Sequence, residues 1–187
     1  MTSEKITTDT EVISQTKQWI NEVVIGLNFC PFAKRVFDKG LICYRVANNQ
    51  SLEDDLLSLL TLCGELTQNE ELETGFVIYP NNYADFEEYL DFLELANQVL
   101  IEQDYEGVYQ LASFHPHYCF DGVDIKAAEN FTNRSPYPML HLLREESLEK
   151  TLEQYKEPDE IPIRNIQVAT QKGVDFFTGI LKNIKHD

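Results

Sequence analysis

The chain has 187 residues, of which 43% are hydrophobic and 11% aromatic, so its size and composition favour one domain with a substantial core. Its 15 basic and 32 acidic residues give a net charge of −17, which repels nucleic-acid backbones and anionic membranes and excludes both as expected partners. No apolar run reaches the roughly 18 residues of a membrane helix, and the polar start of the chain does not resemble a signal peptide. We therefore expect a cytoplasmic protein.

The first half of the chain shows helical spacing interrupted by two short apolar runs. Thr8 and Glu11 form a capping box ahead of apolar residues at helical spacing, whereas residues 1–9 are expected to form a flexible tail. The expected elements are a helix over about 10–26, a short helix after Pro31 that has Cys30 near its cap and ends at Gly40, a strand over 41–46, a helix from Ser51 to about Gly64, a strand over 75–79, and a long helix opened by Asn82 and Asp85.

The second half contains two further strands and a long connection between them. The expected elements are a strand over 108–114, a weak helical patch over 126–130, a strand over 138–143, an acidic helix over 145–155, a break bracketed by Pro158 and Pro162, and one closing amphipathic helix that carries the apolar residues from Ile163 to Ile184. Strands that alternate with helices predict an α/β fold, with α+β as the alternative, in which helices pack on a mixed sheet of about four strands within a single domain. The connection over 116–136 is a poor crossover helix, so the direction of the fourth strand stays open.

That connection is the first candidate for a functional region, because loops of about 20 residues in compact domains are usually functional or disordered. Its aromatic residues argue against disorder, so we expect it to fold onto the body of the protein. If the fourth strand runs antiparallel to the third, His115 approaches the segment 133–135.

Four segments carry a resemblance to a known family. They read CPFA over 30–33, FHPHY over 114–118, NRSPYPMLHLLRE over 133–145 and IPIRN over 161–165. Together they resemble the signature segments of a bacterial family known as domain of unknown function fourteen-fifteen (DUF1415), and the similarity spans most of the chain. The resemblance implies a bacterial cytosolic protein and no particular activity.

Three residues are candidates for catalysis. His115 and His141 lie on or beside neighbouring strands and titrate near neutral pH, which suits a general acid or base. Cys30 is a candidate nucleophile, because a helix N-terminus and the nearby Lys34 and Arg35 would favour its thiolate. The alternatives are a half-buried His141 with one hydrogen bond and a small, buried, inert cysteine at a packing corner.

Three arginines, Arg134, Arg144 and Arg164, lie in the segments that carry the resemblance. A guanidinium group is the natural partner of a carboxylate or phosphate, so together they could bind an anion, with Asn133, Ser135 and Tyr137 as further ligand-binding residues. The alternative is that each arginine pairs with an acidic neighbour, as Arg144 could with Glu145 or the acidic helix.

The leading hypothesis is an enzyme that acts on a small anionic metabolite in an Arg/His pocket formed by residues 114–144. The sequence specifies neither a reaction nor a cofactor. One alternative is a non-enzymatic module whose aromatic loop and closing helix meet a partner chain. A second is a metal-binding protein in which His115 and His141 share an ion with Cys30 or His117, although four widely spaced cysteines without a CxxC pair predict reduced thiols rather than a zinc ribbon.

Overall fold

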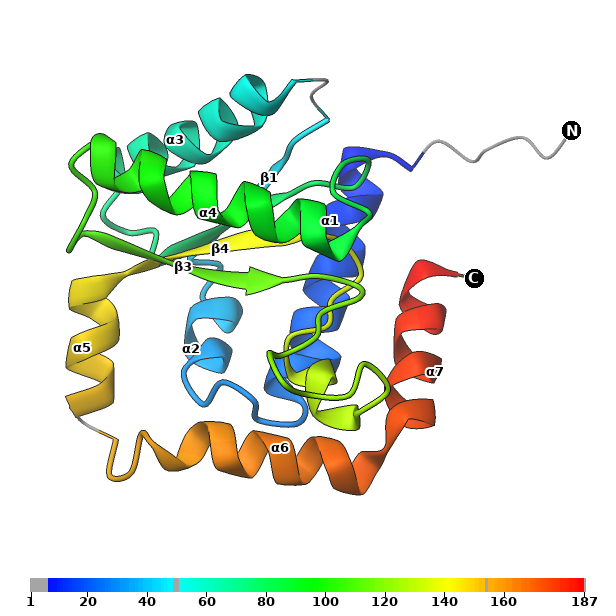
Figure 1. The fold of residues 1–187 in the computed structure, drawn as a ribbon. Coiled ribbons are helices and arrows are strands. Elements are labelled where there is room, and N and C mark those ends of the chain that lie inside the picture. Colours follow the sequence, from blue (N-terminus) through cyan, green and yellow to red (C-terminus); the bar gives the residue numbers. More distant parts are fainter. Residues whose placement is uncertain (1–6, 49–50, 154, 187) are drawn as a thin grey trace, which may run out of the picture.

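The computed structural model describes residues 7–48, 51–153 and 155–186 and shows one sheet between two layers of helices (Figure 1). The strands are β1 (Ile42–Val46), β2 (Thr74–Ile78), β3 (Tyr109–Phe114) and β4 (Met139–Arg144). The α-helices are α1 (Asp9–Trp19), α2 (Ala33–Asp38), α3 (Leu52–Gln68), α4 (Phe86–Glu102), α5 (Glu145–Glu153), α6 (Glu160–Lys172) and α7 (Val174–Lys185). A π-helical segment, η1 (Ile20–Ile25), continues α1, and a 3₁₀ helix, η2 (Ala128–Thr132), lies in the connection between β3 and β4.

The sheet has the strand order β1-β2-β4-β3. β1 runs parallel to β2, whereas β4 pairs antiparallel with both β2 and β3. The expected mixed sheet of four strands with helices packed on it is therefore confirmed, and the direction of the fourth strand is now known. As expected for that direction, the backbone N–H of His115 donates to the carbonyl of Asn133 at 3.2 Å.

Side chains alternate between the two faces of the sheet, and each face carries its own apolar core. Leu140 and Leu142 of β4 pack with α3 and α4 on one face. α3 lies so close to this face that a Cβ on Gly75 would be 2.7 Å from Leu62 Cδ1. On the other face, Met139 belongs to a core with residues of α1, η1, α6 and α7. Figure 1 shows these two layers, with α5 leaving the end of β4 beside α2.

Local capping signals place most helix starts correctly. The side chain of Thr8 accepts from the Glu11 N–H at 3.3 Å, and that of Ser51 accepts from the Asp54 N–H at 3.1 Å. The cap of α4 differs from the expectation, because among the described contacts it is the Asp85 side chain that accepts from the first turn. Asn82 instead donates to the buried carboxylate of Asp55 at 2.8 Å, which ties the turn after β2 to α3.

Three boundaries in the helical layers differ from those expected. The first helix changes to π-helical geometry at Ile20, and the second begins at Ala33, so Cys30 lies in the preceding turn rather than at its cap. The closing helix is two helices, because Gly173 has a φ of 77° and turns the chain between α6 and α7. Most of the expected N-terminal tail, residues 1–6, lies outside the described residues, and α1 begins at Asp9.

Among the described residues, no helix combines the length and the apolar character that crossing a bilayer requires.

The Tyr89 hydroxyl joins α4 to the end of the β3–β4 pair. It donates to the carbonyl of Met139 at 2.8 Å and accepts from the N–H of Phe114 at 3.2 Å, and Tyr89 is fully buried. Tyr89→Phe leaves both backbone groups without this partner, so we expect the free energy of unfolding in urea to fall by about 1–3 kcal/mol. Tyr105→Phe is the matched control, because no partner of its hydroxyl is found in the described part of the chain. Equal losses in the two variants would contradict this role.

Candidate functional site

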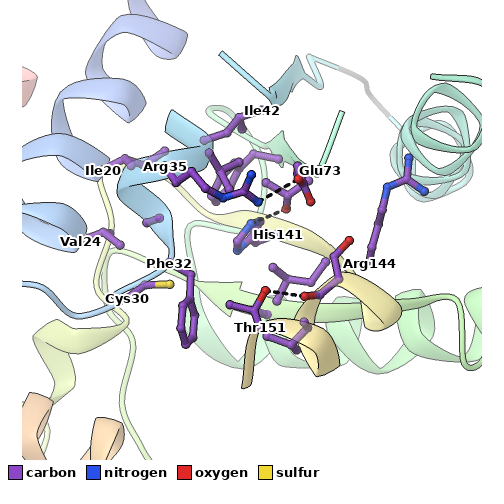
Figure 2. Close-up of a pocket in the computed structure, with 18 of the residues that line it drawn as sticks. Ile20, Val24, Cys30, Phe32, Arg35, Ile42, Glu73, His141, Arg144 and Thr151 are labelled. Atoms are coloured by element: carbon purple, nitrogen blue, oxygen red, sulfur yellow. Dashed lines mark hydrogen bonds and ion pairs between the residues drawn. The ribbon is translucent and has the colours of Figure 1, made fainter. Parts of the chain in front are cut away.

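A half-open cavity of about 500 Å³ lies on the face of the sheet that carries η1 and α2. The sheet forms its floor, and η1, α2 and α5 contribute its walls (Figure 2). Its apolar lining includes Trp19, Ile20, Val24, Phe32, Leu143 and Leu148. The volume, the apolar walls and the few polar groups are typical of small-molecule sites.

The π-helical segment shapes one wall of this cavity. In η1 the backbone N–H of Gly26 bonds the carbonyl of Asn21, five residues earlier. This wider turn presents Ile20 and Val24 to the cavity. π-Helical turns are rare and frequent at functional sites, which agrees with this position.

His141 is the central polar group of the cavity floor. It occupies the middle of β4, opposite Phe76 of β2 and Ala112 of β3. Its imidazole ring stacks on the Phe76 ring, with 4.1 Å between the ring centroids and 5° between the planes. The ring is therefore held in one orientation by the strand register and by this stacking.

Hydrogen bonds assign the tautomer of His141. The Thr74 hydroxyl donates its one proton to the carbonyl of Leu142 at 2.5 Å, so its oxygen must accept from the imidazole Nε2 at 2.7 Å. Nδ1 then carries the lone pair. Nδ1 has no hydrogen-bond partner among the described residues. The atom is not fully buried, and His141 lines the cavity, so Nδ1 is open to the cavity.

Burial lowers the pKa of His141 to about 3, because a charged imidazolium in this apolar setting would lose its hydration. The imidazole is thus neutral at pH 7. A neutral ring with Nε2–H fixed on Thr74 offers the cavity one hydrogen-bond acceptor, Nδ1.

The rim of the cavity carries one ion pair. Arg35 donates to Glu73 at 2.9 Å, and the side chains keep 58% and 27% of their area exposed, so the pair is a solvated one with nearly cancelling charges. On α5, the Thr151 hydroxyl donates to the carbonyl of Ser147 at 2.6 Å, and both residues line the cavity. The rim and α5 therefore contribute one neutralised ion pair and two small hydroxyl residues, in addition to Thr74 and His141 on the floor.

Cys30 lies between this cavity and a second one. The second cavity, also about 500 Å³, shares Val24, Cys30 and Phe114 with the first. Burial raises the pKa of the Cys30 thiol despite hydrogen bonds from the Phe32 and Ala33 amides that lower it. The expected preference for thiolate is therefore reversed.

The two cations expected to favour a Cys30 thiolate are engaged elsewhere. Lys34 pairs with Asp38 at 2.7 Å, and Arg35 pairs with Glu73. Cys30 meets the cavity as a neutral thiol.

Arg144 contributes to the cavity lining, but its guanidinium points away from His141 (Figure 2). It donates to the carbonyls of Leu66, Leu72 and Asn69 and to the Tyr109 hydroxyl. Leu66 belongs to the last turn of α3, where carbonyls lack helical partners. Arg144 thus fastens the end of α3 to the sheet and does not pair with the acidic helix.

His115 lies on the α4 side, apart from the cavity. It is fully buried, its Nε2 lies 2.8 Å from the Tyr83 carbonyl, and its Nδ1 accepts from the backbone N–H of His117 at 3.0 Å. Burial lowers its pKa. Both ring nitrogens are used within the protein, so the structure does not bring His115 and His141 into one site.

The remaining predicted residues also bond within the protein. Arg134 donates to the carbonyls of Tyr118 and Ile125 at 3.0 and 2.7 Å, and burial lowers its pKa. Arg164 donates to the carbonyl of Asn28 and to the side chain of Asn165. The others bond as follows: Asn133 to the Ser113 carbonyl, Ser135 to the Tyr137 carbonyl and Tyr137 to the Gln15 side chain. Of these five, only Asn133 lines either cavity, the second one.

The other two expectations concern metals and partner chains. Within the part of the chain that the structure describes, no three His, Cys, Asp or Glu side chains are placed to hold a metal ion. On α6 and α7, Ile163 and Phe176 are 50% and 37% exposed, but the contacts do not identify a partner chain.

Sequence reasoning found His141, Cys30 and Arg144 but missed Thr74, Phe76 and the Arg35–Glu73 pair. Strand alternation was the available signal, since Thr74, Phe76 and Ile78 share one face of β2. The pairing of this face with His141 depends on the β2–β4 register, which local sequence does not reveal.

The low pKa of His141 makes a testable contribution to stability. Below pH 6.5 an unfolded histidine takes up a proton, whereas folded His141 stays neutral until about pH 3. The free energy of unfolding therefore falls between pH 6.5 and 3, by about 1 kcal/mol per pH unit from this group. We expect His141→Phe, measured by urea unfolding from pH 7.5 to 4.5, to show a shallower decline than wild type. Gln110→Phe, which adds the same ring at an exposed position without a titratable group, should keep the wild-type slope; an unchanged slope in His141→Phe would contradict the assignment.

Comparison with known proteins gives a family and no function. A family model described as "Protein of unknown function (DUF1415)" matches residues 11–179. No curated protein and no solved structure matches the chain.

Proposed function

Since the chain belongs to DUF1415, a family of proteins of unknown function, we propose from the cavity alone that it binds a small, largely apolar, uncharged molecule carrying a hydrogen-bond donor. One observation carries this proposal: the lone pair of His141 Nδ1 opens into a preformed apolar cavity. An acceptor inside such a cavity selects a ligand that donates to it, because burying it without a partner costs free energy.

The cavity supports binding more strongly than acid–base catalysis. A group with a pKa near 3 is a weak base at pH 7, whereas general bases are most effective with a pKa near the working pH. The thiol of Cys30 is also neutral, because burial raises its pKa. These two groups suit recognition of a ligand rather than proton transfer to it.

The contacts of the arginines favour an uncharged ligand over the anionic metabolite that the sequence suggested. Arg134 and Arg144 direct their donors to backbone carbonyls, and Arg164 donates to the Asn28 carbonyl and the Asn165 side chain. In the cavity itself, Arg35 is paired with Glu73.

Filling the cavity tests whether it is the binding site. Leu148 lines the cavity from α5, a helix without buried residues, so Leu148→Trp adds volume there with little change to the core. We expect this variant to lose binding of 2-(2-naphthyl)ethanol, an apolar alcohol, in a calorimetric or NMR titration. Glu149→Trp places the same ring at the next, exposed position and should bind as wild type does. Undiminished binding by Leu148→Trp, or no binding by wild type, would overturn the proposal.

The charge of the ligand provides a second test. 2-Naphthylacetate has the same ring but carries a carboxylate, which cannot donate to Nδ1 and which approaches a protein of net charge −17. We expect 2-(2-naphthyl)ethanol to bind at least about tenfold more tightly than 2-naphthylacetate at pH 7. The carboxylate lacks the hydrogen bond to Nδ1, and burying its charge costs free energy. Tighter binding of the carboxylate would instead favour the anionic ligand expected from the sequence.

A further inference from the structure

Four side chains form a row across the sheet beneath the cavity. Strand register aligns Tyr44 with Phe76, Phe76 with His141, and His141 with Ala112. The first three rings are nearly parallel: 5.9 Å and 10° separate Tyr44 from Phe76, and 4.1 Å and 5° separate Phe76 from His141. On β3, the next strand of the sheet, where a further ring would continue the row, Ala112 has only a methyl group.

The face of His141 opposite Phe76 is free of other rings in the described structure. Phe114 is the one ring near it from β3, with centroid distances of 6.2 Å to His141 and 6.5 Å to Phe76. A ring stacked on the outer face of His141 would lie roughly 8 Å or more from Phe76, about two stacking distances. Phe114 is therefore beside the two stacked rings, tilted by 40° to His141, and does not cover that outer face.

The position over Ala112 is accessible. Ala112 is half-buried and lines the cavity, as does His141. Neighbouring strands place opposed side chains about 5 Å apart, so a ring above Ala112 would face His141 at stacking distance. The edge of this position is bounded by Phe114, which is itself held by an edge contact with Trp19 at 5.1 Å.

From this arrangement we infer that the ligand contains a planar aromatic ring, which occupies the space over Ala112 and stacks on His141 as the fourth ring of the row. The inference rests on the proposed function and specifies its ligand class. Nδ1 lies in the plane of the imidazole, so a ring stacked on the face cannot donate to it directly. The donor must therefore be on a short arm or a second group attached to the aromatic ring.

A matched pair of alcohols separates the aromatic requirement from cavity binding in general. 2-(2-Naphthyl)ethanol and 2-(decahydro-2-naphthyl)ethanol have the same carbon skeleton and the same hydroxyl arm, but only the first has a planar π face. We expect wild type to bind the naphthyl compound about two- to tenfold more tightly, the range that aromatic stacking provides. The carbon-bound ring protons of His141 should move upfield in NMR spectra with the naphthyl compound alone, because of its ring current.

The possible results distinguish the two proposals. Equal or tighter binding of the saturated alcohol, without the upfield shift, would overturn the aromatic inference and leave cavity binding standing. If neither alcohol binds, the proposed function fails and this inference fails with it.

A variant that supplies its own ring gives an independent check. Ala112→Phe should place a phenyl ring on His141, shift the His141 ring protons upfield without ligand, and abolish binding of the naphthyl compound. Gln110→Phe is the control, because Gln110 is exposed on the same face of β3 and does not line the cavity. If Ala112→Phe folds and still binds the naphthyl compound as wild type does, the inference is overturned. If this variant does not fold, the comparison of the two alcohols on the wild-type protein decides the inference.

Discussion

The register of β4 between β2 and β3 is the constraint on which the site depends. β4 is paired antiparallel on both sides, so its side chains alternate strictly between two cores. Leu140 and Leu142 enter the core beneath α3 and α4, which leaves His141 on the opposite face, over Phe76 and beside Ala112. A slip of one residue would exchange the faces and place an imidazole in the α3–α4 core. Because that core must be filled by apolar side chains such as Leu140 and Leu142, the acceptor Nδ1 of His141 lies on the cavity side of the sheet.

The polar residues of the long connection hold its backbone in place. A loop that folds against the body of a protein must satisfy its own carbonyl and amide groups, since water no longer reaches all of them. Arg134 donates to the carbonyls of Tyr118 and Ile125. The imidazole of His115 bonds the carbonyl of Tyr83 through Nε2 and accepts from the amide of His117 through Nδ1. These contacts explain why the aromatic-rich segment is ordered although it contains little regular structure.

Much of the fold could be predicted from the sequence because its signals are local. Ser51 before Asp54, alternation in residues 41–46 and the apolar run at 75–79 each identify an element without knowledge of the rest. The change to π-helical geometry at Ile20 has no such signal, because apolar spacing compatible with an α-helix also fits one wider turn. Gly173 could equally stand inside an amphipathic helix, so the division between α6 and α7 depends on how they pack.

The site was less predictable than the fold because its members meet only through tertiary structure. His141 could be selected as a titratable residue within a strand, but Phe76 and Ala112 are ordinary strand residues until the register aligns them. The arginines were predicted to bind an anion or to pair with acidic side chains, and they bind mostly carbonyls instead. A carbonyl is present in every residue, so sequence alone does not indicate which of them a guanidinium will reach.

The charge of the whole protein and that of the cavity together favour an uncharged ligand. A net charge of −17 creates a field that slows the approach of anions and attracts cations. Among the described residues that line the cavity, however, the carboxylate of Glu73 is paired with Arg35, so none is left unpaired there to bind a cation. A neutral molecule alone meets neither the outer repulsion nor a cost of burying charge. For such a molecule, selectivity must come from shape, from stacking and from the single acceptor of His141.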